Sequence, residues 1–380
     1  MSRIVLRSFA ACYSPENADL SSDRRMGCLK AGFVLLLFAT LCCSVLRGEG
    51  KSFIDWKGLS NPVLSYPNWS IKDAAMAYRD GTFYVFFSAF YEDNGRVRSH
   101  VAEVSTRDFK HYSKPILDFD GEEEGWIGMC SPDVQRLGKQ YVITFNSWGN
   151  QPGRPNKLFY MSSLDLVHWS KRRTLAQNLT GAKSVIDASV AEAGGGYYLI
   201  WKERSPAGEM RPRLGFGKAL DRPFTFVGNG FPSLLMKDGK ENGLMHENYE
   251  FVYAKNHLYL LTTDYAVQGP HINDRVPQPD LRWVKQGPRL YALEPGSRWL
   301  KWIGGSRLDI PEEKFNTVNR DNAAALYGWC GHDGYYYLIY AGVTERQTYA
   351  GRGWNQLGLA RSRDLVHWMV AGHMGPGRTK

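Results

Sequence analysis

The sequence has few cysteines for its 380 residues, and most of them lie near the N-terminus. Only two of the six, Cys130 and Cys330, lie beyond residue 50. Two cysteines exclude a disulfide framework, and no Cys/His spacing in the sequence is that of a zinc site. The sequence leaves open whether this pair forms one bridge or two buried free thiols.

Dense runs of basic residues are absent as well. The formal net charge is +9 at pH 7, yet the Lys and Arg residues are spread along the chain. Nucleic-acid sites gather basic residues into a patch or stripe, so we do not expect nucleic acid as a partner. A diffuse positive surface favours an anionic glycan instead.

Only one long apolar run suggests a targeting function. Residues 31–46 (AGFVLLLFATLCCSVL) carry no charge and follow several basic residues, which is the arrangement of an export signal. The run is short for a membrane span, which needs about 20 apolar residues. We therefore expect residues 1–50 to be a leader with its true start at Met26, and the remainder to be secreted or periplasmic. No stable membrane insertion is expected after cleavage, and an uncleaved signal anchor is the alternative.

What the sequence does contain points to an all-β protein. Aromatic residues make up 13% of the chain and 39 glycines are scattered through it, which favours strands joined by many tight turns. Five aromatic, strand-like runs each follow a turn signal, and we expect each turn to join the two strands of a hairpin. The five turns are centred on Asp80-Gly81, Gly138-Lys139, Gly194-Gly195, Lys255-Asn256 and Asp333-Gly334.

A heptapeptide cassette of the form Ser/Thr-x-Asp-Leu/Phe-x-His-Trp/Tyr is also repeated, at residues 106–112, 163–169 and 362–368. A unit of several short strands that recurs about every 60 residues is typical of a β-propeller, because one four-stranded blade cannot bury both of its faces alone. We therefore predict that residues 51–380 form a single all-β domain, a five-bladed β-propeller. A two-layer sandwich of the same strands is the alternative.

The cassette is expected to be an outer turn of each blade. Its Trp would pack between neighbouring blades, and we expect His168 and His367 to be structural.

Acidic residues precede the strand that should be innermost in four of the blades. The series is Asp73, Asp133, Asp187 and Glu247. Equivalent positions in successive blades converge on the propeller axis, so these carboxyl groups would repel one another and raise one another's pKa. Glycoside hydrolysis needs such a set, with one carboxyl protonated and another ionised. For each Asp the alternative is a turn residue that accepts backbone N–H bonds.

The segments around these residues resemble those of glycoside hydrolase family 43 and its five-bladed propeller relatives, in the same order along the chain. Asp73-Ala-Ala-Met looks like the family's Asp-Pro segment with the general base, and Ile186-Asp187-Ala-Ser is similar to the segment whose Asp tunes the acid. Cys130-Ser-Pro-Asp133-Val looks like a Trp-Ala-Pro-Asp-Val segment. Glu247-Asn-Tyr stands where the family has Glu-Gly-Pro with the general acid.

The resemblance implies an inverting glycosidase that acts on arabinosyl, xylosyl or galactosyl linkages in oligo- or polysaccharides. Asp73 would be the base, Asp187 the tuning residue and Glu247 the acid. Glu250 is a rival acid, and period-two alternation would put Glu247 and Glu250 on opposite faces of one strand. A carbohydrate-binding propeller without catalysis is one alternative, and a phosphorylase or anhydrosugar hydrolase on the same scaffold is another.

Further residues are candidates for substrate binding or for a metal site. Asp133 is a candidate substrate-binding residue. Sugars stack on aromatic rings and bind fork-shaped donors, so we add Trp126, Trp148, Trp201 and Arg320, with a core position as the alternative for each Trp. Many family members hold a channel calcium with a His of the fifth blade, but the matching stretch here, Arg320-Asp-Asn-Ala, has none. We therefore expect no metal and no cofactor, and a channel calcium is the alternative.

Overall fold

A computed structural model gives the structure of most of the chain from Ile54 to Gly372. The residues between these limits that it does not describe are 150, 182, 205–209, 268–283, 318–321 and 343–354. The chain divides between Glu49 and Gly50, and every described residue belongs to the second unit. The predicted leader lies outside the described residues and stays a prediction. None of the helices in the described part has the length and apolar character needed to cross a membrane.

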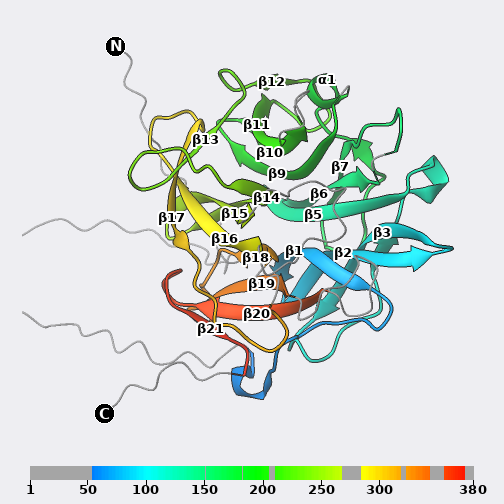
Figure 1. Cartoon of the computed structure of the whole chain (residues 1–380), viewed down its shortest axis with the longest axis vertical. Helices are drawn as coiled ribbons and strands as arrows, with labels where there is room; N and C mark the ends of the chain where they lie inside the picture. Colours follow the sequence, from blue (N-terminus) through cyan, green and yellow to red (C-terminus); the bar gives the residue numbers. More distant parts are fainter. Residues whose placement is uncertain are drawn as a thin grey trace, which may run out of the picture. The chain divides into compact units, whose positions relative to one another are not determined.

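The regular secondary structure of the described residues is almost entirely β-strand, and the strands form four sheets (Figure 1). The first sheet contains two successive antiparallel groups, which are joined by a single parallel pair between Ser99 and Gly128. Its strands are β1 (Ser70–Arg79), β2 (Thr82–Asp93), β3 (Arg96–Thr106), β4 (Leu117–Phe119), β5 (Gly128–Leu137), β6 (Gln140–Trp148), β7 (Leu158–Ser163) and β8 (Arg173–Thr174).

The other three sheets follow in chain order. The second comprises β9 (Val185–Ala193), β10 (Gly196–Arg204), β11 (Met210–Gly217) and β12 (Phe224–Phe226). The third comprises β13 (Ser233–Leu235), β14 (Met245–Ala254), β15 (His257–Val267), β16 (Val284–Leu293) and β17 (Lys301–Arg307), with β13 parallel to β17. The fourth comprises β18 (Asn322–Tyr327), β19 (Tyr336–Gly342), β20 (Gln356–Ser362) and β21 (Trp368–Val370). Helical structure among the described residues is limited to α1 (Gln177–Thr180) and the 3₁₀ turns Trp56–Gly58 and Glu122–Glu124.

The predicted hairpins are confirmed. Each of the five turns joins two antiparallel strands, namely β1 to β2, β5 to β6, β9 to β10, β14 to β15 and β18 to β19. Asp80 and Gly81 have φ angles of 49° and 82°, the conformation that a two-residue type I′ turn requires. The turn chemistry therefore determines where these strands reverse.

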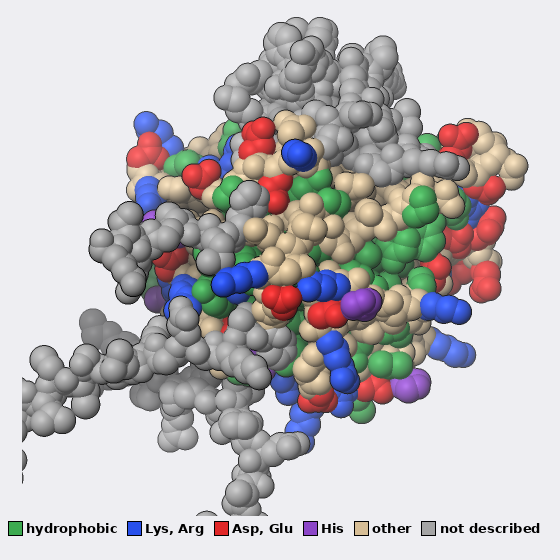
Figure 2. Space-filling view, turned by 90° about the horizontal axis from the view of Figure 1, so that it is seen from below, with side chains coloured by type: hydrophobic (Ala, Val, Ile, Leu, Met, Phe, Trp, Pro, Cys, Tyr) green, Lys and Arg blue, Asp and Glu red, His purple; other side chains and the backbone are tan. Residues whose placement is uncertain are grey.

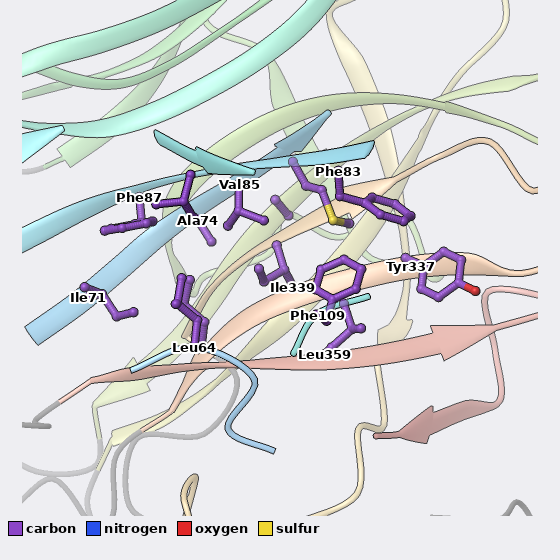
Figure 3. Packing of buried hydrophobic residues seen from close by; sticks show 14 of the residues in the cluster. Leu64, Ile71, Ala74, Phe83, Val85, Phe87, Phe109, Tyr337, Ile339 and Leu359 are labelled. Carbon is purple, nitrogen blue, oxygen red and sulfur yellow. The ribbon is translucent and has the colours of Figure 1, made fainter. Parts of the chain in front are cut away.

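The first strands of successive groups lie against one another. Strand β1 lies against β5 and β18, β9 lies against β5 and β14, and β14 lies against β18. In Figure 1 the groups follow one another in chain order, with these strands nearest the middle of the unit. The first and last sheets share a hydrophobic cluster that includes Leu359 of β20, and in it Val85 of β2 points toward Ile339 of β19 (Figure 3). Strands from the two ends of the described chain therefore share one core.

The repeated cassette forms a self-contained turn. In the second copy, the Ser163 hydroxyl accepts the backbone N–H groups of Asp165 and Leu166. Asp165 in turn accepts the backbone N–H of His168, and its other oxygen lies 2.8 Å from Nδ1 of the same residue. His168 and His367 are exposed side chains that each bind the Asp of their own turn. The prediction that they are structural is confirmed.

The cassette tryptophans contact the preceding group of strands, as expected. Trp169 donates from Nε1 to Glu103 of β3 at 2.8 Å. Trp368 is buried in a cluster that includes Val252 and Leu261 of the third sheet. These two cassettes thus tie one group of strands to its neighbour.

The cassette should make stability depend on pH. Hydrogen bonds from the backbone and then the ring of His168 hold the pKa of Asp165 below its usual range. A lowered pKa in the folded state stabilises the fold above the ordinary Asp pKa of about 4, and this contribution is lost as the pH falls through the lower folded value. Asp165→Ala should therefore lower the melting temperature most near pH 7, and the difference from wild type should shrink below about pH 4. Leu164→Ala, at an exposed neighbour, is the control in thermal unfolding across pH. A deficit that did not change with pH would contradict this role.

Charged side chains are mixed rather than segregated on the face shown in Figure 2. Lys and Arg side chains lie among Asp and Glu side chains over its described part, as their spread along the sequence suggests. Cys130 and Cys330 are both free thiols, Cys130 buried and Cys330 partly buried. Of the two alternatives left open, the bridge is therefore excluded.

Candidate active site

A β-bulge interrupts β1, β5, β9, β14 and β18 at an equivalent place. At each bulge, the strand contains one residue more than the partner strand between the flanking paired residues. In every bulge, the first residue between the flanking pairs has a positive φ, which residues other than glycine seldom adopt and which Asp and Asn tolerate best. These residues, with their φ angles, are Asp73 (52°), Ser131 (54°), Asp187 (56°), Asn248 (53°) and Ala323 (49°).

The positions of the bulges show that the four acidic residues are not all equivalent. Asp73 and Asp187 are at equivalent positions, but Glu247 stands one residue before this position and Asp133 two residues after it. The expectation that all four are equivalent was wrong, because counting residues from the strand start does not reveal where a bulge lies. Asp133 is instead equivalent to Glu250 of β14.

Asp73, Asp187 and Glu247 are nevertheless brought together by two shared partners. Asn248 donates from its side-chain Nδ2 to Asp73 Oδ1 (3.1 Å) and from its backbone N–H to Asp187 Oδ2 (3.2 Å). Lys202 of β10 lies with Nζ 2.7 Å from Glu247 Oε1 and 3.9 Å from Asp187 Oδ2. Asp73 and Asp187 are almost completely buried, whereas the Glu247 side chain is 28% exposed. Three first strands thus contribute one carboxyl each to a connected cluster.

Sequence reasoning missed the roles of Lys202 and Asn248. Lys202 continues an apolar run, Tyr-Tyr-Leu-Ile-Trp, and is only 2% exposed. A lysine in such a strand indicates a buried partner of opposite charge. Asn248 stands where the resemblance has glycine, and its positive φ explains the exchange, since Asn is among the few residues that replace glycine there.

The electrostatics of the cluster favour a division between protonated and ionised carboxyls. Burial raises the pKa of Asp187, the Lys202 ammonium opposes the rise, and the charges of Glu247 and Asp73 add to it. Lys72 lies with Nζ 3.3 Å from Asp73 Oδ1. The ammonium groups of Lys72 and Lys202 thus lie beside the three carboxyl groups of the cluster. General acid and base catalysis both become available in such an arrangement.

A second pair of carboxyls, Asp133 and Glu250, lines a small pocket beside this cluster. The pocket is also lined by Asp187, Asn248 and Ala325, among other residues. Burial raises the pKa of Asp133 to about 7. Burial and the charge of Asp133 raise the pKa of Glu250 well above its usual value, although the carboxylate accepts the backbone N–H of Leu326 at 2.8 Å. At neutral pH Glu250 is therefore largely protonated, whereas Asp133 titrates close to neutrality.

Glu247 and Glu250 do not obey the expected alternation. The register of β14 shifts between them, at Asn248. Glu247 consequently reaches Lys202, while Glu250 lines the pocket with Asp133. The expectation that one of the two must point away on the opposite face fails because it assumes a regular strand.

The three tryptophans predicted to stack on sugars differ in how far they are exposed. Trp201 is completely buried in a hydrophobic cluster, so a sugar cannot reach it and its prediction as a subsite residue is wrong. Trp126 is 6% exposed and has the Arg154 guanidinium 3.6 Å above its ring, which leaves no free stacking face there. Trp148 is partly exposed and meets Phe90 at 5.4 Å, and its role stays a prediction. Arg320 lies outside the described residues.

Within the described ranges, no three His, Cys, Asp or Glu side chains are arranged to hold a metal ion. The stretch that matches the family's His lies partly in 318–321, outside those ranges.

Removing the Lys202 charge should raise the pKa of Asp187. Lys202→Met keeps the side-chain length but removes the charge that lowers the pKa of Asp187. Asp187 should then stay protonated to higher pH, which ¹³C NMR of labelled carboxyl groups reports. Lys183→Met, which removes a half-exposed lysine 3.9 Å from Glu203, should leave this titration unchanged. The same titration in wild type and Lys202→Met would contradict the assigned influence.

Comparisons with known proteins agree with the fold. No family model matches the chain, and no curated protein matches its sequence. A glycosyl hydrolase from Bacteroides ovatus superposes with a TM-score of 0.56 at 15% identity, over 80% of this chain and 91% of that chain. A GH43_1 enzyme from Xanthomonas citri gives 0.52 at 11% identity, over 80% and 91%. The RS223 β-xylosidase gives 0.52 at 11% identity, over 78% and 94%.

At these identities the likeness concerns the fold. The chain has the all-β fold of glycosyl hydrolase structures, which include a family 43 enzyme. The resemblance noted in the sequence is thus confirmed at the level of the fold.

Proposed function

We propose that the chain is a glycoside hydrolase whose catalytic groups are Asp73, Asp187 and Glu247. The observation that carries the proposal is their connection through Asn248 and Lys202, although they lie on three different strands. A carboxyl cluster of this kind costs folding stability, so its presence favours a chemical role. The fold shared with glycosyl hydrolase structures supports the same class.

The fold we propose in detail is a closed, five-bladed β-propeller over residues 51–380. Its blades would be β1–β4, β5–β8, β9–β12, the third sheet and the fourth sheet. The mutual contacts of the first strands support closure, since β1 lies against β18 as well as β5. A two-layer sandwich offers no reason for five equivalent strands to meet in this way.

The mechanism follows from the positions of the three carboxyls. Asp73 takes a proton from a water molecule, and the water oxygen attacks the anomeric carbon as the glycosidic bond breaks. Glu247 gives its proton to the leaving oxygen, so one proton is taken up and one is released in each turnover. Asp187 and Glu247 both lie beside the Lys202 ammonium, and the charge of Asp187 influences whether Glu247 carries a proton. Attack by water from the opposite face inverts the anomeric carbon.

The substrates we propose are arabinosyl, xylosyl or galactosyl linkages of oligo- or polysaccharides. The similarity to structures that include a β-xylosidase supports this range. Release of reducing sugar from aryl glycosides and plant or algal polysaccharides tests it, and inorganic phosphate in parallel assays distinguishes a phosphorylase. Proton NMR of the first product should show the inverted anomer. Retention would contradict the role of Asp73 as a base.

A carbohydrate-binding propeller without catalysis is the second candidate. The observation that favours it is the ion pair of 2.7 Å between Lys202 and Glu247, because a carboxylate held by an ammonium gives up no proton. Binding of a glycan in calorimetry with no release of product over the same panel would decide for this candidate.

We also propose that the mature chain is secreted or periplasmic. The apolar run at 31–46 and the basic residues before it support this location. Mass spectrometry of the native protein should place its N-terminus near Lys51, and an intact Met1 would contradict cleavage.

A further inference from the structure

Asn248 has a backbone conformation that few residues adopt, and it uses both of its donor groups. Its φ is 53°. The backbone N–H bonds Asp187, and the side-chain Nδ2 bonds Asp73, which lies 175 positions earlier in the chain. Glycine would adopt this backbone most easily. Glycine would keep the bond to Asp187 but lose the one to Asp73, so the asparagine side chain adds a contact to the cluster.

The contact from Asn248 is made to only one of the two carboxylate oxygens of Asp73, Oδ1. The Asn248 amide lies 3.1 Å from Asp73 Oδ1, and the Lys72 ammonium lies 3.3 Å from the same oxygen. Within the described part of the chain, both contacts therefore go to Oδ1. A carboxylate held by two donors on one oxygen cannot rotate freely, so Oδ2 keeps a constant direction.

We propose that Asn248 is a positioning residue that orients the Asp73 carboxylate so that Oδ2 receives the proton of the attacking water. This inference rests on the proposed function, because it assumes that Asp73 is the base. Asn248 contacts no reacting atom in this role, and it acts through Asp73. It also couples the base to Asp187, because one residue bonds both carboxyls.

Asn248→Gly isolates the side-chain contact. Glycine tolerates the positive φ and retains the backbone N–H, so the bond to Asp187 should persist. Ala323→Gly is the matched control, because Ala323 occupies the equivalent bulge position with a φ of 49° and no polar side chain. We expect Asn248→Gly to lower kcat by about 10- to 100-fold with little change in KM, since misplacing a catalytic group by about 1 Å costs on this order. Ala323→Gly should keep kcat near wild type.

A spectroscopic measurement tests the contact without relying on turnover. The side-chain amide signal of Asn248 is identified in a ¹⁵N spectrum by its loss in Asn248→Gly. It should shift in Asp73→Asn and stay in place in Asp80→Asn, which changes an exposed carboxyl at the turn after β1. An Asn248 side-chain amide signal that keeps its position in Asp73→Asn would overturn the inference.

The outcomes for the inference and for the proposed function can be told apart. Wild-type kcat in Asn248→Gly, together with an inactive Asp73→Asn, would overturn the positioning role and leave the proposed function intact. Equal losses in Asn248→Gly and Ala323→Gly would show that glycine at a bulge is the cause, and would also overturn it. Full activity of Asp73→Asn, or a wild-type chain that cleaves no substrate, would overturn the proposed function and the positioning role with it.

Discussion

Asp73→Asn should abolish hydrolysis of all substrates, with a fall in kcat of about 10²- to 10⁴-fold. Asn has the shape of Asp and tolerates the φ of 52° at this position, whereas Ala would add backbone strain. The amide cannot take a proton from water, and a better leaving group does not replace an activated nucleophile. The loss should therefore be as large for a dinitrophenyl glycoside as for a natural linkage.

Asp80→Asn is the control for Asp73→Asn. Asp80 also has a positive φ, near 49°, but its side chain is 84% exposed at the turn after β1. Its replacement should leave kcat unchanged while the melting temperatures of the two variants stay close to that of wild type. Activity of Asp73→Asn on the dinitrophenyl glycoside would mean that water is activated by another group, and Asp73 would lose its role.

The features that could be predicted from the sequence are those encoded within a few residues. Turn signals such as Asp80-Gly81 specify a backbone conformation locally, so the hairpins were placed correctly. The cassette likewise contains its own donors and acceptors, which is why His168 could be recognised as structural. These contacts depend little on the rest of the chain.

The features that could not be predicted depend on which strands become neighbours. A bulge is defined by mismatch with a partner strand, so the offset between Asp133 and Asp73 is not visible in one strand alone. Lys202 approaches Glu247 from a different sheet. Trp201 is a core residue because side chains from other strands cover it, which the sequence around it does not reveal.

The surroundings of Glu247 and Glu250 support the proposal that Glu247 is the acid. Glu250 is 7% exposed, and one of its oxygens accepts the Leu326 N–H, so it has little access to a leaving group. Glu247 is 28% exposed and lies beside Asp187 through Lys202. Substrate that displaces the ammonium from Glu247 would let the carboxyl keep a proton, and Asp187 would then remain paired with Lys202.

Glu247→Ala should therefore damage catalysis in proportion to how much the leaving group needs a proton. We expect kcat for a natural linkage to fall by about 10²- to 10⁴-fold, and kcat for a dinitrophenyl glycoside to fall by less than about tenfold, because dinitrophenolate leaves without protonation. Glu250→Gln, which keeps the side-chain size in the pocket, is the comparison and should affect both substrates equally. If Glu250→Gln showed the dependence on the leaving group and Glu247→Ala did not, the acid would be Glu250. In that case the pair of Asp133 and Glu250 would hold the catalytic proton, and the Lys202 ion pair would be structural.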